Sequence, residues 1–169
     1  MTKFSKIAFS SLAVLGAFLP ALPASAEDLA VSATVISSCA IVTAPVAFGS
    51  YDPSVANAAA PLDAAGSVTV TCTLGSVAHI LLSQGANDIA GTPDIPQRRM
   101  LGGTGAFLNY YLYTDAGRTG VWGNTDTTGV DHTGTGAASL PISVFGRIPA
   151  AQNVPAAAYA DTVAATVTF

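Results

Sequence analysis

Hydrophobic and polar residues alternate along most of the chain, which is the period of a β-strand with one buried face. The clearest run is residues 67–73, in which Val68, Val70 and Cys72 share one face. Further strands are predicted at residues 77–83, 108–114, 140–145 and 159–169. Turn-forming groups of glycine, proline and aspartate separate these runs, so the pattern predicts an all-β sandwich.

The first 26 residues predict a secretory signal peptide. Lys3 and Lys6 precede an uncharged, mostly apolar stretch at residues 7–19, and Ala24-Ser25-Ala26 offers small residues for cleavage. The stretch is shorter than the ~20 residues that a membrane-spanning helix needs, which argues against an uncleaved anchor. We therefore expect a mature chain that begins at Glu27 and has no membrane span.

Cleavage makes the composition more acidic. Residues 27–169 hold no lysine, and four arginines against ten carboxylates leave a net charge of −6. An acidic chain is a poor partner for nucleic acid, so none is expected. Only 9% of all residues are charged, against about 25% in ordinary soluble domains, which argues against a cytosolic enzyme.

Cys39 and Cys72 are the only cysteines. In an exported chain the simplest interpretation is one disulfide, worth roughly 3–4 kcal/mol for a loop of this length. A metal site would need more soft ligands, and His79 and His132 lie in unrelated contexts. A redox pair would usually have Cys-x-x-Cys spacing, so we predict a structural disulfide.

Both ends of the mature chain carry an alternating segment. At the N-terminus Leu29, Val31, Ala33 and Val35 share one face, and the other end stops at Phe169 on a predicted strand. A sandwich whose last strand ends the chain can lack an edge strand, which an extended segment of a neighbour can supply. The pattern leaves open an ordinary closed sandwich in which the N-terminal strand pairs internally.

Short motifs in a fixed order suggest a family. They are Ser38-Cys39, Arg99-Met100 and residues 48–53, 66–72, 108–115, 121–123, 144–149 and 159–163. Together they resemble the spore coat protein U domain family, which includes subunits of archaic chaperone–usher pili of the Csu type. The resemblance covers residues 29–169.

The resemblance implies an incomplete immunoglobulin-like sandwich that lacks its final strand. A periplasmic chaperone completes the fold first, and the N-terminal extension of the next subunit replaces it in a fibre built at an outer-membrane usher. On this sequence it implies an extension at residues 27–38 and a pilin domain at residues 39–169, tied by Cys39–Cys72. The donor residues would be Leu29, Val31, Ala33 and Val35, and the groove edge Val163, Ala165, Val167 and Phe169.

The implied function is a structural subunit of a homopolymeric or heteropolymeric surface fibre that supports adhesion and biofilm formation. No cofactor and no enzymatic activity are implied. One departure from the family pattern is Ala157, where members often carry glycine before the tyrosine of the last strand. Alanine tolerates positive φ poorly, so we expect a different turn there.

Other residues that suggest chemistry have structural interpretations. Arg98-Arg99 is interpreted as a solvated loop rather than an anion site, and His79 as a packed or edge residue. Asp131 and His132 are neighbours on an extended chain and point to opposite faces. Residues 126–131 lack the oxygen spacing of a calcium loop.

The aromatic cluster is expected to pack in the core rather than to form a platform for sugars. It comprises Trp122, Tyr110, Tyr111 and Tyr113, of which the last two share a face. Three alternatives to a pilus subunit stay open: a structural protein of a spore or cell coat, an outer-membrane β-barrel and a secreted sugar-binding sandwich. Phe169 would suit a barrel, but predicted strands of 5–7 residues are short against the roughly 9–11 that a barrel needs.

Overall fold

A computed structural model of the protein describes residues 24–89, 91–138 and 140–169, so most of the predicted signal peptide lies outside the described residues. The chain forms two units, the first ending at Thr34 and the second spanning Val35–Phe169. The described part of the first unit, residues 24–34, contains no strand or helix. Among the described residues, no helix is long and apolar enough to cross a membrane.

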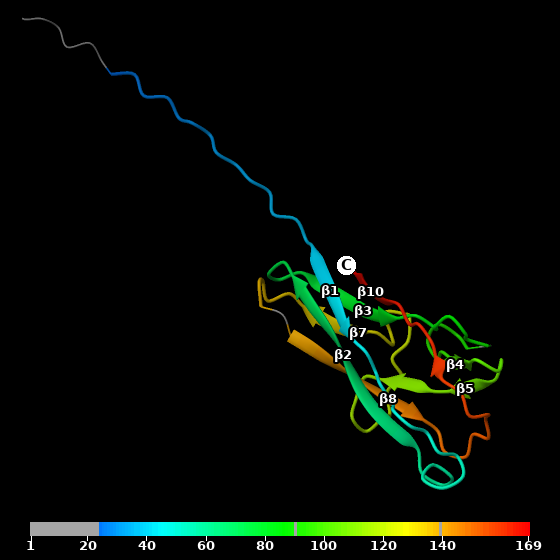
Figure 1. Cartoon of the computed structure of the whole chain (residues 1–169). Helices are drawn as coiled ribbons and strands as arrows, with labels where there is room; N and C mark the ends of the chain where they lie inside the picture. The colour runs from blue at the N-terminus through cyan, green and yellow to red at the C-terminus, as the bar shows by residue number, and fades with distance from the viewer. Residues whose placement is uncertain (1–23, 90, 139) are drawn as a thin grey trace, which may run out of the picture. The chain divides into compact units, whose positions relative to one another are not determined.

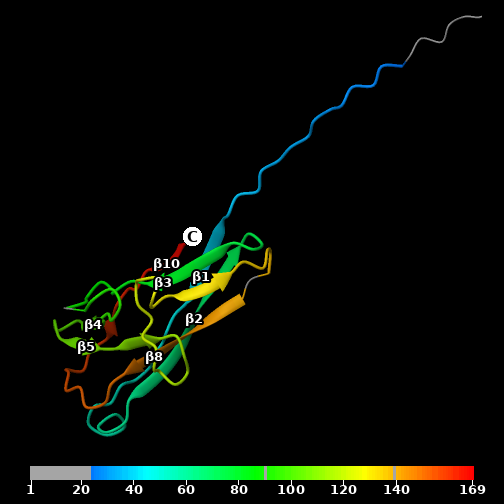
Figure 2. The ribbon, with the colours of Figure 1, turned by 180° about the vertical axis from the view of Figure 1, so that it is seen from behind.

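The second unit is built from short antiparallel strands. They are β1 (Cys39–Ala44), β2 (Leu62–Cys72), β3 (Val77–Leu82), β4 (Arg99–Gly102), β5 (Phe107–Asn109), β6 (Tyr111–Tyr113), β7 (Val130–Thr133), β8 (Leu140–Ile148), β9 (Tyr159–Ala160) and β10 (Ala165–Thr168). One sheet has the order β1-β2-β8-β6, a second β10-β3-β7 and a third β5-β4-β9. The long pair β2 and β8 runs side by side (Figure 1), and β3 lies beside β7 behind it (Figure 2).

The two larger sheets bury their apolar faces in one core. Val68 and Val70 of β2 are buried together with Ile80 of β3 and Val144 of β8. Trp122 is fully buried among them, and its indole N–H donates a 2.9 Å hydrogen bond to the carbonyl oxygen of Ile80. The predicted all-β sandwich is therefore confirmed.

The predicted disulfide is also confirmed. Cys39 opens β1 and lies directly opposite Cys72, the last residue of β2, in the β1–β2 ladder. Their sulfur atoms are bonded at 2.05 Å. The bond therefore fixes the first strand of the domain to the centre of the four-stranded sheet.

Two predicted strands are each divided by a crossing between sheets. The run 108–114 breaks at Tyr110, because β5 pairs with β4 whereas β6 pairs with β8. The run 159–169 breaks at residues 161–164, because β9 pairs with β4 whereas β10 pairs with β3. Alternation of side chains continues across both breaks, so the sequence pattern did not reveal them.

Candidate functional site: the groove between β1 and β10

The strands β1 and β10 each lie at the edge of a sheet. Within the described residues β1 pairs only with β2, and β10 pairs only with β3. Cα atoms of the two strands approach within 8 Å, but no hydrogen-bonded ladder joins them. Each therefore presents a free edge, and unpaired strand edges readily accept another extended segment.

The hydrogen-bonding pattern of the β1–β2 ladder shows which backbone groups of β1 do not bond to β2. The N–H of Thr73 donates to the carbonyl oxygen of Ser38 at 2.9 Å. Since alternate residues of an antiparallel strand face the partner, Cys39, Ile41 and Thr43 direct their N–H and C=O groups away from β2. These backbone groups are open to pairing on the side of β10.

The same argument applies to β10. The N–H of Ser83 donates to the carbonyl oxygen of Ala164 at 2.8 Å, so Ala165 and Val167 direct their backbone groups away from β3. Their half-buried side chains pack against the core. The strand thus offers free backbone groups at its edge and apolar side chains at its inner face.

A cavity of about 300 Å³ lies between these edges. Thr43 and Ala44 line it from β1, and Val163 and Ala165 line it from the segment of β10. Core residues of the two larger sheets also line it, among them Val68, Leu82, Leu112 and Val144. We call the two free edges and this cavity the β1–β10 groove.

A second cavity of about 780 Å³ adjoins the groove. The two cavities share Val46, Phe48 and Met100 as lining residues. The second cavity continues to the loop after β1 and to residues 154–159 before β10.

Of the four residues predicted to form the groove edge, three pack against the core and one is exposed. Val163, Ala165 and Val167 are half-buried against the core, and the first two line the cavity. Phe169 is 66% exposed and follows the last paired residue. Whether these residues hold a donor strand stays a prediction.

The predicted donor residues lie where the structure has no strand. Leu29, Val31 and Val35 are 88%, 87% and 83% exposed, and Ala33 is also exposed. Several exposed apolar side chains gathered in one short segment are typical of an interaction site. Their role as donors is not decided by this chain alone.

The groove ends at a polar cluster around Asp161, which lines the cavity. Its carboxylate accepts hydrogen bonds from the Tyr110 hydroxyl at 2.7 Å, the Asn87 side-chain amide at 2.9 Å and the Ala86 N–H at 3.0 Å. Burial raises the pKa of Tyr110, and the hydrogen bond to Asp161 raises it further. Gly85 has φ +86°, and a Cβ there would overlap the Asp161 carboxylate.

Arg98 is buried next to this cluster, so its interpretation as part of a solvated loop is wrong. It is 1% exposed, and its guanidinium donates to the carbonyl oxygens of Leu82, Ser83 and Trp122 at 2.7–2.9 Å. Burial lowers its pKa to about 10. Arg98 therefore serves as a bridge between the end of β3 and the segment at Trp122.

Arg99 is not part of a solvated loop either, since it opens β4 and is half-buried. Its guanidinium lies 3.8 Å from the centre of the Phe107 ring, and its Nε donates to the carbonyl oxygen of Asn87 at 2.9 Å. Arg99 and Phe107 belong to the neighbouring strands β4 and β5. The side chain is thus used in packing the small third sheet.

The histidines and the aromatic residues lie largely as predicted. Asp131 is exposed whereas His132 is buried, so the two point to opposite faces. His79 forms an edge contact instead, its Nδ1 lying 2.7 Å from the carboxylate of Asp131 on β7. Tyr110 and Trp122 are core residues.

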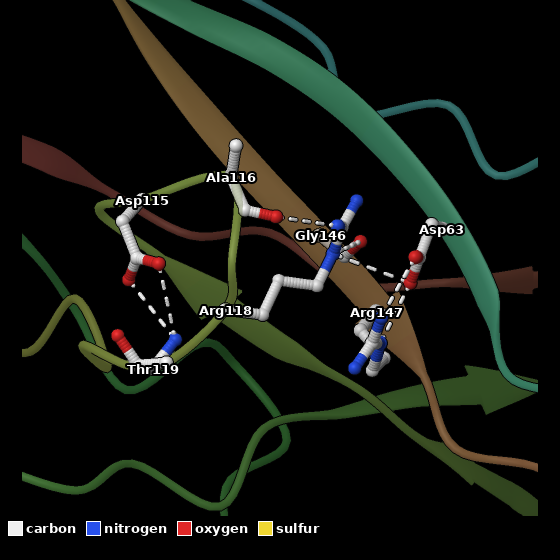
Figure 3. A network of polar contacts seen from close by, with 7 residues as sticks. All are labelled: Asp63, Asp115, Ala116, Arg118, Thr119, Gly146 and Arg147. Carbon is white, nitrogen blue, oxygen red and sulfur yellow. Dashed lines mark hydrogen bonds and ion pairs between the residues drawn. The ribbon is translucent and has the colours of Figure 1, made fainter.

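The outer face of the four-stranded sheet carries an ion-pair network (Figure 3). Arg147 donates to both oxygens of Asp63, at 2.7 and 2.8 Å, and Arg118 lies 3.2 Å from the same carboxylate. The hydrogen bond from Arg147 is the main cause of the lowered pKa of Asp63. Since Asp63 and Arg147 are opposite in the β2–β8 ladder, the network clamps the two longest strands.

The remaining predictions concern a turn and metal binding. The described residues other than glycine with positive φ are Arg118 and Ala151, so Ala157 does not adopt that conformation. Within the described ranges no group of three or more histidine, cysteine or carboxylate side chains is placed to hold a metal ion.

Sequence reasoning missed three components of the groove. The resemblance implied a strand after the extension, but the alternation of Cys39, Ile41 and Thr43 was not used to give that strand bounds or to recognise its free edge. Sequence reasoning assigned no role to Asp161, although a lone carboxylate in an otherwise apolar alternating run is a signal of a polar contact. The burial of Arg98 had no signal in the local pattern.

The architecture defines a class of β-sandwich with a disulfide-anchored first strand and an open edge next to its last strand. The chain belongs to the spore coat protein U domain family, whose model matches residues 26–166.

Two known proteins resemble the chain at different levels. It is 42% identical to Protein U of Myxococcus xanthus, over 99% of this chain and 98% of that protein. A solved complex of the CsuC chaperone and the CsuE tip adhesion subunit, from the archaic chaperone–usher Csu pili of Acinetobacter baumannii, contains a chain of similar fold. That match has a TM-score of 0.55 and 24% identity, and covers 80% of this chain but 40% of the other, so it shows the fold alone.

Proposed function

We propose that the chain is a structural subunit of a secreted surface fibre that is assembled by donor-strand exchange and supports adhesion and biofilm formation. The observation that carries this proposal is the pair of free strand edges beside an apolar cavity. The same chain carries an unpaired segment whose apolar residues alternate with the matching period. Catalysis has no part in this role.

An extended segment of a second copy matches the free edges in length and chemistry, and β1 and β10, whose Cα atoms approach within 8 Å, would move apart to the ~9.6 Å that separates the neighbours of an inserted strand. Residues 29–35 and residues 163–169 are equally long, about 20 Å from first to last at ~3.3 Å per residue. Backbone groups of the inserted strand would pair with Ala165 and Val167, while Leu29, Val31, Ala33 and Val35 would face the cavity. Burying one valine contributes roughly 1.5–3 kcal/mol, so several such residues would hold the strand firmly.

The open groove also implies a partner before assembly. An exposed apolar edge invites aggregation, so the subunit needs a periplasmic chaperone to cover it and an outer-membrane usher to exchange the chaperone for the next subunit. The similarity of fold to a subunit solved with its chaperone supports this route. The protein would then pass through the periplasm and end at the cell surface.

A second candidate is a structural protein of a spore or cell coat. The name of the family and the similarity to Protein U along the whole chain favour it. This role uses the same groove and the same extension, and differs in where the polymer is deposited. Localisation of the exported protein in intact cells and spores distinguishes the two candidates.

Deletion of residues 27–38, with the signal peptide retained, tests the proposed function. Surface material from cells that express the whole chain should give a ladder of oligomers on unheated denaturing gels, because inserted strands resist detergent. The deleted chain should give monomers or chaperone complexes only. An unchanged ladder from the deleted chain would show that the extension is not the donor.

A further inference from the structure

Three aromatic side chains lie together on the outer face of the four-stranded sheet. Tyr111 and Tyr113 of β6 lie outside the core, unlike the other two members of the aromatic cluster, and their ring centres are 6.3 Å apart. Tyr113 pairs with Phe145 of β8, which pairs in turn with Ala65 of β2. The three aromatic residues are half-buried and Ala65 is exposed, so this row is open to solvent.

A polar row runs beside the aromatic one across the same three strands. Tyr111 pairs with Arg147, and Arg147 pairs with Asp63. Arg118 reaches the same carboxylate from the loop after β6 (Figure 3), and its guanidinium lies 6.0 Å from the centre of the Phe145 ring. Aromatic rings and charged hydrogen-bonding groups are therefore side by side on one face of the sheet.

The polar groups of this face are only partly used by the protein itself. Arg147 donates to Asp63 from Nε and Nη2, whereas Arg118 donates to two backbone carbonyls from Nε and Nη1. Among the described residues, Nη1 of Arg147 and Nη2 of Arg118 bond to no group, and the same is true of the hydroxyls of Tyr111 and Tyr113. Donors and acceptors are thus left for a ligand.

The charges of this network balance. Its two guanidiniums belong to Arg118 and Arg147. Its two carboxylates belong to Asp63 and to Asp115, which accepts hydrogen bonds from backbone N–H groups in the loop of Arg118. The network therefore has no net charge, and the predicted mature chain as a whole is acidic at −6. A polyanion gains no net attraction here, so the matching ligand is neutral and able both to donate and to accept hydrogen bonds.

We propose that this face is a binding site for a neutral polysaccharide. The C–H groups of a sugar ring pack on the electron-rich faces of aromatic side chains. Sugar hydroxyls donate and accept hydrogen bonds, which suits the free guanidinium N–H groups and tyrosine hydroxyls. The residues of the site are Asp63, Tyr111, Tyr113, Arg118, Phe145 and Arg147. None of them lines the β1–β10 groove, so a bound polysaccharide does not compete with an inserted strand.

The test applies the exported whole chain to an array of neutral glucans, mannans, galactans and N-acetylhexosamine oligomers, with polygalacturonate as the acidic comparison. The wild type should bind a neutral glycan, and added salt should leave its affinity within about twofold, because no ion pair to the ligand is screened. Ala65→Glu, which places a long charged side chain in the aromatic row, should reduce this affinity about tenfold. Ala40→Glu is the matched control, since Ala40 is exposed on the same face at the far edge strand β1, and should bind as the wild type does.

A second pair of variants examines the aromatic contact itself. Tyr113→Ala should weaken binding about tenfold, and Tyr113→Phe, which keeps the ring, should weaken it less. If Tyr113→Ala does not accumulate, Ala65→Glu decides alone. A folded wild type that binds no neutral glycan, equal binding by Ala65→Glu, or preferred binding of polygalacturonate that high salt abolishes would each overturn the site. Ala65→Glu should still assemble, so the loss of this site leaves the proposed function intact. A change in lateral association without a change in glycan binding would make the face an interface between copies instead.

Discussion

The hydroxyl of Tyr110 donates a 2.7 Å hydrogen bond to the carboxylate of Asp161. Each residue lies where the chain passes from the small third sheet to one of the two larger sheets: Tyr110 between β5 and β6, and Asp161 between β9 and β10. The bond therefore joins the two crossings. It also holds Asp161 in place, and Asp161 leads into β10 and its free edge.

Replacing Tyr110 by phenylalanine should destabilise the fold by about 1–2 kcal/mol, because the half-buried carboxylate of Asp161 loses one of its donors. Chemical denaturation monitored by the fluorescence of the buried Trp122 measures this loss. Tyr111→Phe is the matched control, since Tyr111 is half-buried and its hydroxyl bonds to no group in the described residues. Equal losses in the two variants would contradict the role given to the bond.

The same bond predicts a dependence on alkaline pH. The pKa of Tyr110 is raised above its usual 10.0 by burial and by Asp161. In the unfolded chain the phenol ionises near pH 10, so its stabilising contribution is complete below pH 10 and is lost as the pH rises further. Arg98, with its pKa lowered to about 10, acts in the opposite direction.

Comparison of the wild type with Tyr110→Phe isolates the tyrosine, because both chains retain Arg98. The free energy of unfolding should therefore fall more steeply between pH 9 and pH 11 in the wild type than in the variant. Parallel curves would mean that Tyr110 ionises equally in the folded and unfolded chains.

The disulfide should account for a large share of the stability of a domain with an open edge. Replacing Cys39 and Cys72 together by serine should lower the free energy of unfolding by roughly 3–4 kcal/mol and reduce accumulation. Single replacements should be at least as harmful, since each leaves one free thiol. Mass spectrometry of exported protein should find the wild type without free thiols, and two free thiols in folded material would oppose the assignment.

The sequence was informative wherever a strand runs without interruption within one sheet. Val68, Val70 and Cys72 alternate along the unbroken strand β2, and their burial followed directly from their spacing. The crossings at Tyr110 and Asp161 could not be predicted in this way, because side chains keep alternating while the hydrogen-bonded partner changes. The local alternation predicts which face of the sheet a side chain points to, but it does not predict which strand pairs with it.

The same limit applies to the candidate site. The apolar alternation at Val163, Ala165 and Val167 predicted which side chains face inward. The opposite edge at Ile41 and Thr43, and the buried guanidinium of Arg98, depend on contacts between segments far apart in the sequence. Such contacts leave no periodic signal, so only the folded chain reveals them.

The most direct test of the central claim compares two neighbouring residues of the extension. Val31 belongs to the face predicted to enter the groove of a second copy, whereas Ser32 belongs to the other face. Val31→Asp would place a charge in an apolar cavity and remove the burial of a valine, while Ser32→Asp would leave its charge in solvent.

Electron microscopy of surface fibres, with co-purification of the chaperone complex, is the measurement that decides. We expect no fibres from Val31→Asp but an intact subunit–chaperone complex, because the chaperone fills the groove with its own strand, and we expect normal fibres from Ser32→Asp. Fibres from Val31→Asp in the amount given by the wild type would contradict donor-strand assembly and return the N-terminal segment to an ordinary strand of its own chain.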